Sequence, residues 1–318
     1  MTNLVASRFY WESGGHHIFL EGLVMRKRKL TTTKDVFLFL LPAIILFGGI
    51  LIAPIIMSGY YSFFDWDLVK GNQGFVGFEN YKNLFTSQSI AFTKALGNSL
   101  LLAAMSVFVQ LPISLGLALL LGRGIKGERV FLSIFFLPVL ISTVVIGQLW
   151  LKIYNPNYGI LNVALCALGF DKFKDFTWLS GKPALLACFI PTLWQYVGYH
   201  MLLLYAGVKS VPTEYREAAK IDGATEGQVN RFIVIPYIKG IIKVSVIFAV
   251  TGSLKSYDMI KILLGGQKHS PVEVPTTRLI NQIIERNKVG MGSSIAVMLI
   301  ILCFAFALII GRVFREDD

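Results

Sequence analysis

The fold is decided by a stretch near the N-terminus, VFLFLLPAIILFGGILIAPIIM, which runs from Val36 to Met57 without a charged residue. A helix rises 1.5 Å per residue, so this stretch is long enough to cross a hydrocarbon core of about 30 Å. The basic cluster Arg26–Lys29 precedes it, but the run is longer than the apolar core of a signal peptide. We therefore predict a transmembrane helix. Met25 is an alternative start, which would leave residues 1–24 as an unstructured extension.

Further apolar runs follow along the chain, and the composition agrees with them. Hydrophobic residues make up 54% of the sequence and charged residues 15%, whereas soluble proteins carry about 25% charged residues. These observations predict an all-α integral membrane protein of about six transmembrane helices. The spans beyond residues 36–57 are expected at residues 96–121, 130–151, 183–208, 241–260 and 290–314.

The positive charge of the chain is unevenly distributed. The net charge is +11, and Lys and Arg are densest in the tail of residues 1–35 and in the loops that six spans would place on the same side. Because basic loops stay in the cytoplasm, both termini, including residues 315–318, are predicted to be cytoplasmic. The sequence contains no basic stripe with interleaved aromatic residues, so nucleic-acid binding is not indicated.

Two kinds of site are not indicated by the sequence. Cys166, Cys188 and Cys303 have neither metal-site nor disulfide spacing, so no metal site is expected. The nearest match to a phosphate-binding loop is the segment of residues 122–129, but Glu128 occupies the position of the required lysine. We therefore expect no cofactor on this chain and no ATP site.

Segments outside the spans also have helical patterns. Residues 160–168 and 276–288 are predicted to form helices along the surface. The loop of residues 209–240 is predicted to form two short helices, the first capped by Thr213 and ended by a left-handed Gly223. Thr225 and Gln228 predict a capping box for the second helix, and Pro236 predicts an interruption before the fifth span. Two charged helices with apolar residues between two spans favour docking against another protein.

This loop resembles the cytoplasmic signature loop of ATP-binding-cassette (ABC) importer permeases. The resemblance rests on Glu217-Ala218-Ala219, then Gly223, then residues 233–236, where Ile235 departs from the family's leucine. Leu41-Pro42-Ala43, Phe136-Leu137-Pro138 and residues 155–159 are similar to the carbohydrate-uptake branch, specifically to its maltose- and glycerol-phosphate-type first permease. Tyr257-Asp258 followed by Gly265-Gly266 is similar to another segment of that branch.

The resemblance implies a fold, a function and partners. The fold would be that of a type I ABC-importer permease in the bacterial inner membrane, and the chain, not itself an enzyme, would translocate a sugar or oligosaccharide. Implied partners are a second permease subunit, two ATPase subunits that bind ATP and Mg, and an extracellular solute-binding protein. The loop would couple the chain to the ATPase through Glu217, Ala218, Ala219, Asp222, Gly223, Ile233 and Pro236.

Candidate residues for the substrate pathway are aromatic or hydroxyl-bearing, since aromatic faces and hydrogen-bonding groups hold sugars. Trp194 and Tyr199 lie in the fourth span, and the resemblance favours the fifth. There, Ser253, Ser256 and Tyr257 follow the spacing i, i+3, i+4 and are expected to share a helical face.

The ionisable Lys255 lies within the fifth span and has two interpretations. It could attract an acidic sugar or a phosphate ester, or it could pair with Asp258 or extend to the membrane interface. An ion-coupled secondary transporter is an alternative function, but it calls for inverted repeats and intramembrane carboxylates. No convincing repeat is seen, and Asp258 is the only acidic residue within a predicted span.

Overall fold

A computed structural model describes residues 33–265 and 272–314, together with four short strands within residues 7–22. The predictions on residues 315–318 and Gly266, and on the tail other than these strands, lie outside the described residues. The chain divides into two compact units, Met1–Ile56 and Met57–Asp318.

The first unit contains the strands and most of the first apolar helix. Strands β1 (Ser7–Phe9) and β4 (Leu20–Gly22) pair antiparallel, as do β2 (Glu12–Ser13) and β3 (His16–His17), so the expectation of an unstructured extension is wrong at these strands. Helix α1 (Thr33–Phe47) continues through the π-helical turn η1 (Gly48–Ile52) into α2 (Ala53–Tyr61). Its large apolar side chains are exposed, as is appropriate for a helix that has lipid as its solvent.

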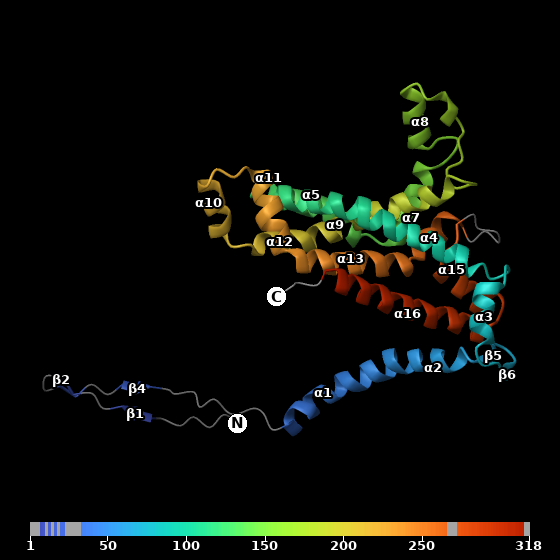
Figure 1. Cartoon of the computed structure of the whole chain (residues 1–318), viewed down its shortest axis with the longest axis horizontal. Helices are drawn as coiled ribbons and strands as arrows, with labels where there is room; N and C mark the ends of the chain where they lie inside the picture. The colour runs from blue at the N-terminus through green and yellow to red at the C-terminus, as the bar shows by residue number, and fades with distance from the viewer. Residues whose placement is uncertain are drawn as a thin grey trace. The chain divides into compact units, whose positions relative to one another are not determined.

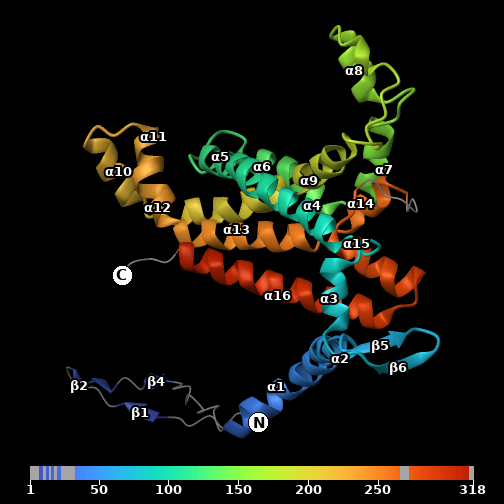
Figure 2. The same ribbon diagram turned by 45° about the vertical axis from the view of Figure 1, so that its right-hand side comes forward.

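The second unit is built around long helices (Figures 1 and 2). In both views α10 (Thr213–Ile221), α11 (Glu226–Val229) and α12 (Ile235–Tyr237) lie at one end of α9 (Ala184–Ser210) and α13 (Lys239–Leu254). Helices α3 (Glu79–Thr86) and α15 (Pro275–Ile280) lie towards the opposite end. The helical elements of the bundle are α4 (Phe92–Met105), η2 (Ser106–Gln110), α5 (Leu111–Leu121), α6 (Glu128–Leu140), α7 (Thr143–Ile153), α9 (Ala184–Ser210), α13 (Lys239–Leu254), α14 (Asp258–Leu263) and α16 (Val289–Val313).

Two of the predicted spans are interrupted. The third is not one helix, because α6 and α7 meet at 94° where Ile141 adopts an extended conformation and Ser142 caps α7. The fifth ends as a helix at Leu254 and resumes at Asp258. Hydropathy predicted both as single spans because an apolar run looks the same whether it is straight or broken.

Three helices of the described residues are long and apolar enough to cross a membrane, or up to five if each bent pair is one span. The predicted fourth span, α9, is 27 residues long but is not among them. Its buried polar residues, including Gln195 and His200, lower its hydropathy. The count of six spans, like the cytoplasmic position of both termini, stays a prediction.

Short elements occupy the connections. Helix α8 (Ile160–Ala167) agrees with the helix predicted at residues 160–168. The helix predicted at residues 276–288 is present as α15 (Pro275–Ile280), which continues into the π-helical η5 (Asn281–Glu285) and ends there. The others are the antiparallel hairpin β5 (Phe64–Asp67) and β6 (Gly71–Phe75), α3 (Glu79–Thr86), η3 (Asp171–Phe173), α10 (Thr213–Ile221), α11 (Glu226–Val229), η4 (Asn230–Val234) and α12 (Ile235–Tyr237).

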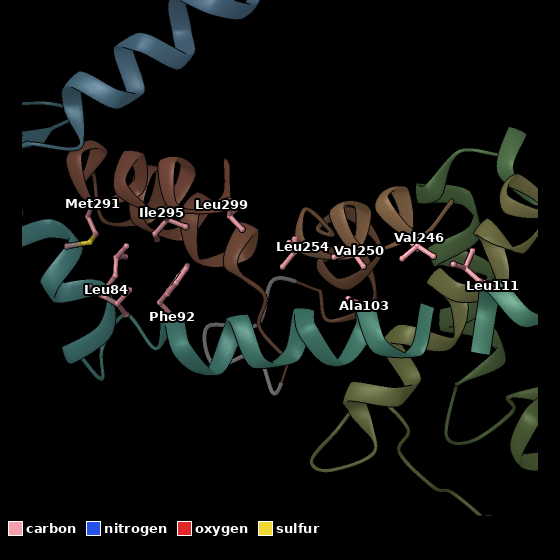
Figure 3. Close-up of a cluster of buried hydrophobic side chains, with 12 residues drawn as sticks. Leu84, Phe92, Ala103, Leu111, Val246, Val250, Leu254, Met291, Ile295 and Leu299 are labelled. Carbon is pink, nitrogen blue, oxygen red and sulfur yellow. The ribbon is translucent and has the colours of Figure 1, made fainter. Parts of the chain in front are cut away.

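The core of the second unit lies where α13 packs against α4 and α16. Phe92 and Ala103 of α4 contribute to one cluster with Val250, Leu254 and Ile295 (Figure 3). A second cluster joins α7, α9 and α14, and a third joins α5 and α9 to the segment that follows α11. The third cluster ties the loop of residues 209–240 to the long helices.

The backbones of α6 and α9 approach closely at Gly198. A Cβ atom built there would lie 1.9 Å from the carbonyl oxygen of Phe135 and 2.9 Å from the Cα atom of Phe136. Hydrogen bonds hold α9 against α5 and η2. Ser114 Oγ donates to the Val197 carbonyl over 2.9 Å, and Gln110 Nε2 donates to the Leu193 carbonyl over 2.7 Å. Small residues and interhelical hydrogen bonds are how helices associate in lipid.

Candidate functional site

A cavity of about 380 Å³ lies among η2, α7, α9, α13 and the segment between α13 and α14. Aromatic and hydroxyl-bearing side chains line much of it. The sequence-predicted residues on its wall are Tyr199, Ser253, Ser256 and Tyr257. The fifth candidate, Trp194, does not line it and is 43% exposed, with its ring edge-on to Trp150 at 6.0 Å between centroids.

Ser253, Ser256 and Tyr257 line the cavity, but for a reason other than the predicted one. Only Ser253 lies on α13, where its hydroxyl donates to the Ala249 carbonyl over 2.7 Å. The chain then leaves the helix, and Tyr257 has a φ of −148° before Asp258 begins α14. The helical-face argument is therefore wrong, because the unwound segment brings these side chains to one cavity.

Helix α9 supplies the polar and aromatic side of the cavity. Tyr199 contacts the ring of Phe248 at 6.3 Å between centroids and lies beside Tyr196 and His200 on the cavity wall. Gln195 Nε2 donates to Thr143 Oγ1 over 3.4 Å, which joins α9 to α7. Hydroxyls and aromatic faces within an apolar wall can hold a polyhydroxylated ligand.

Several cavity residues are absent from the sequence-based candidates. Ser106, Gln110 and Thr143 all line the cavity. Ser106 donates to Gln110 Oε1, so this pair is satisfied without a ligand. A glutamine within an apolar run was the available signal, but nothing in the sequence indicates that it would face α9.

Lys255 and Asp258 both line the cavity. Among the described residues they form no ion pair within 4.0 Å, so the expected pairing of Lys255 with Asp258 is not present. The described residues also contain no cluster of three His, Cys, Asp or Glu side chains that could hold a metal ion.

The loop of residues 209–240, which we call the coupling loop, has most of its predicted local structure. Gly223 follows α10 with a φ of +84°, a conformation that L side chains rarely adopt. Thr225 and Gln228 form the predicted capping box. The prediction that Thr213 caps α10 is wrong, since Thr213 is the first helical residue and Pro212 precedes it without a side-chain cap. The chain bends by 72° between α12, which contains Pro236, and α13.

Charged side chains hold the coupling loop in place. Arg216 donates through Nη2 to the Val208 carbonyl in the last turns of α9. Glu226 accepts from Lys220 Nζ at 2.6 Å and lies 3.9 Å from Arg123, which follows α5. The hydrogen bond from Lys220 lowers the pKa of Glu226 below its ordinary value.

The coupling loop has a buried side and an exposed side. Val234 and Ile238 are buried in the third cluster, with Ala219 and Ile233 packed against it. Ile221 is 85% exposed and Phe232 67%. Glu217, Ala218, Asp222 and Gly223 are exposed as well. A surface of this composition is available to a protein partner.

The family described as "Binding-protein-dependent transport system inner membrane component" matches residues 110–315, which include most of the cavity wall and the whole coupling loop. The chain belongs to this family. It is therefore an ABC-importer permease subunit with the type I importer permease fold. Members of this class of permease are non-catalytic subunits.

Curated relatives include two permeases named for sugars. The diacetylchitobiose uptake system permease protein NgcF of Streptomyces coelicolor is 32% identical over 304 residues, which cover 91% of this permease and 85% of that protein. The multiple sugar-binding transport system permease protein MsmF of Streptococcus mutans is 31% identical over 250 residues, covering 78% and 84% of the two chains.

A solved structure shows the same fold. A chain from a bacterial ABC transporter involved in the import of the acidic polysaccharide alginate aligns with a TM-score of 0.77 and 22% sequence identity. The alignment covers 90% of this permease and 97% of that chain. A further structure of the bacterial alginate transporter, in complex with a periplasmic protein bound to an alginate pentasaccharide, has a TM-score of 0.76 and 21% identity.

Proposed function

We propose that this permease carries a sugar or oligosaccharide across the bacterial cytoplasmic membrane and that ATP hydrolysis on a separate subunit drives it. One observation carries the proposal: a single helix, α13, joins the coupling loop to the cavity. It begins at Lys239, at the end of the coupling loop, and ends at Leu254, beside Ser253 and Lys255 of the cavity wall. Displacement of the coupling loop would therefore move the cavity wall.

The chemistry of the cavity supports a sugar as the substrate. Tyrosine rings provide flat apolar faces, and the hydroxyls and amides around them provide hydrogen-bonding groups. Two relatives at 31–32% identity carry names that refer to diacetylchitobiose and to multiple sugars. Tyr199, Ser253, Ser256 and Tyr257 are our proposed contacts, and Trp194 lies outside the cavity.

The proposal includes a set of partners. The segment of residues 122–129 does not form a phosphate-binding loop because Glu128 stands at the lysine position, so ATP and Mg would bind to two ATPase subunits. Glu217, Ala218, Asp222 and Gly223 would contact an ATPase, while Ala219, Ile233 and Pro236 would set the shape of the coupling loop. A second permease would complete a heterodimer, and an extracellular solute-binding protein would deliver the sugar.

Purification of the complex from native membranes tests this function. We expect the permease to copurify with an ATPase and a second permease, and a sugar-loaded binding protein to stimulate ATP hydrolysis in the reconstituted complex.

Tyr257→Ala should lower sugar uptake several-fold, whereas the matched variant Trp194→Ala should not, because Trp194 does not line the cavity. Uptake that persists without ATP and follows an ion gradient would show a secondary transporter instead.

An anionic sugar or glycerol phosphate is a second candidate substrate, and one observation favours it. Lys255 lines the cavity and has no ion pair among the described residues. Asp258 also lines the cavity and would oppose an anion. We therefore expect Lys255→Met to lower uptake of acidic oligosaccharides several-fold more than uptake of neutral ones if Lys255 binds the anion. An equal change for both would exclude that role, and Lys255→Arg is the charge-conserving control.

A further inference from the structure

The segment between α7 and α9 forms an arm with its own local core. Figures 1 and 2 both show α8 lying away from α9, α13 and α16. Asn162, 4% exposed, donates to the carbonyls of Pro156 and Phe176 over 3.1 and 3.0 Å. Trp178 Nε1 donates to Asn162 Oδ1 over 2.5 Å, so a network of hydrogen bonds holds one side of α8.

Aromatic rings extend this local core. Trp178 stacks on Phe173 with an interplanar angle of 6° and on Tyr154 with an angle of 30°. At the start of α8, a Cβ atom built on Gly159 would lie 2.3 Å from the Asn155 carbonyl oxygen, so the turn requires glycine. These contacts fix one side of α8 against the rest of the arm and leave its other side uncovered.

That second side is apolar and is not covered by this chain. Val163 is 57% exposed and Leu168 is 73% exposed, and Ile160 and Phe170 are exposed as well. The sequence of α8, ILNVALCA, contains no charged residue. Exposing such a patch to water costs free energy, at about 25 cal/mol for each Å² of apolar surface.

Two observations favour lipid as the occupant. Helix α8 begins shortly after α7, which together with α6 is apolar enough to form one candidate membrane span, so α8 adjoins a segment that can lie in the membrane. The arm and its base contain Lys152, Lys172, Lys174 and Lys182 against Asp171 and Asp175, which gives an excess of positive charge that complements anionic headgroups. Exposed Tyr158 is a residue type enriched at membrane interfaces.

We propose that α8 lies in the plane of the membrane interface, with Val163 and Leu168 among the acyl chains of the leaflet at which α7 ends. The lysines of the arm then extend to the lipid phosphates. This placement does not depend on which sugar is carried or on how transport is driven.

Spin labels on the arm test the placement in the assembled complex in anionic lipid nanodiscs. Val163→Cys and Leu168→Cys would be labelled in a background whose three native cysteines are alanine and which retains uptake. Gln73→Cys, in an exposed strand of the β5–β6 hairpin, is the water reference. We expect the ratio of collision rates with oxygen to those with a water-soluble nickel chelate to be several-fold higher at both arm positions than at Gln73.

Either of two other results would overturn the proposal. A ratio equal to that of Gln73 would place the apolar side in water. Slow collisions with both reagents would show that a protein partner, such as the second permease, covers it. Disulfide trapping between the arm and that partner would then identify the contact.

Discussion

Gly198→Ala is expected to destabilise the second unit by disturbing the packing of α6 against α9. The added Cβ would lie 1.9 Å from the Phe135 carbonyl oxygen and 2.6 Å from its carbonyl carbon. These are backbone atoms of α6, which cannot turn aside as a side chain can. Overpacking costs about 1–3 kcal/mol, and we expect the upper end of that range because the whole of α6 must move. Thermal unfolding of the purified complex in detergent, monitored by loss of monodisperse protein, measures the effect.

Gly116→Ala is the matched control for this prediction. Gly116 lies on α5, and no atom comes within 4 Å of a Cβ built there. The control should retain the parental melting temperature, while Gly198→Ala should lose several degrees and most of its yield. Equal melting temperatures for the two variants would contradict the close contact of α6 and α9.

Gly223→Val is expected to lower uptake by about tenfold or more. The left-handed conformation at Gly223 costs an L residue about 1–2 kcal/mol, and a β-branched side chain costs more. This free energy lowers the population of the coupling loop in its observed conformation by a factor of roughly 5–30. The reversal of direction between α10 and α11 depends on this conformation. Glu217 and Asp222, which we propose contact the ATPase, would then be displaced together.

Gly223→Asn separates the effect of backbone conformation from the effect of adding a side chain, because asparagine tolerates the left-handed region better than other non-glycine residues. A Cβ at this position would meet nothing within 4 Å, so only backbone conformation is tested. We expect the asparagine variant to retain most uptake and ATPase copurification, and the valine variant to lose both while its melting temperature changes little. Full uptake by the valine variant would mean that this turn does not transmit motion.

The sequence alone identified the class of protein and the coupling loop, for local reasons. A charge-free run such as Val36–Met57 can be satisfied only by an apolar solvent. The capping box of Thr225 and Gln228 and the left-handed Gly223 were predictable because each joins residues a few positions apart. Where two local preferences competed, as at Thr213 after Pro212, the prediction failed.

Only the tertiary structure decided the cavity. Gln110, Thr143 and Gln195 come from three different helices, and Tyr257 reaches the same cavity because the chain unwinds after Leu254. Hydropathy sums the preferences of neighbours along the chain, so it detects a span but neither its break nor the direction in which its polar groups point. Those depend on contacts between residues far apart in sequence, such as the approach of α9 to α6 at Gly198.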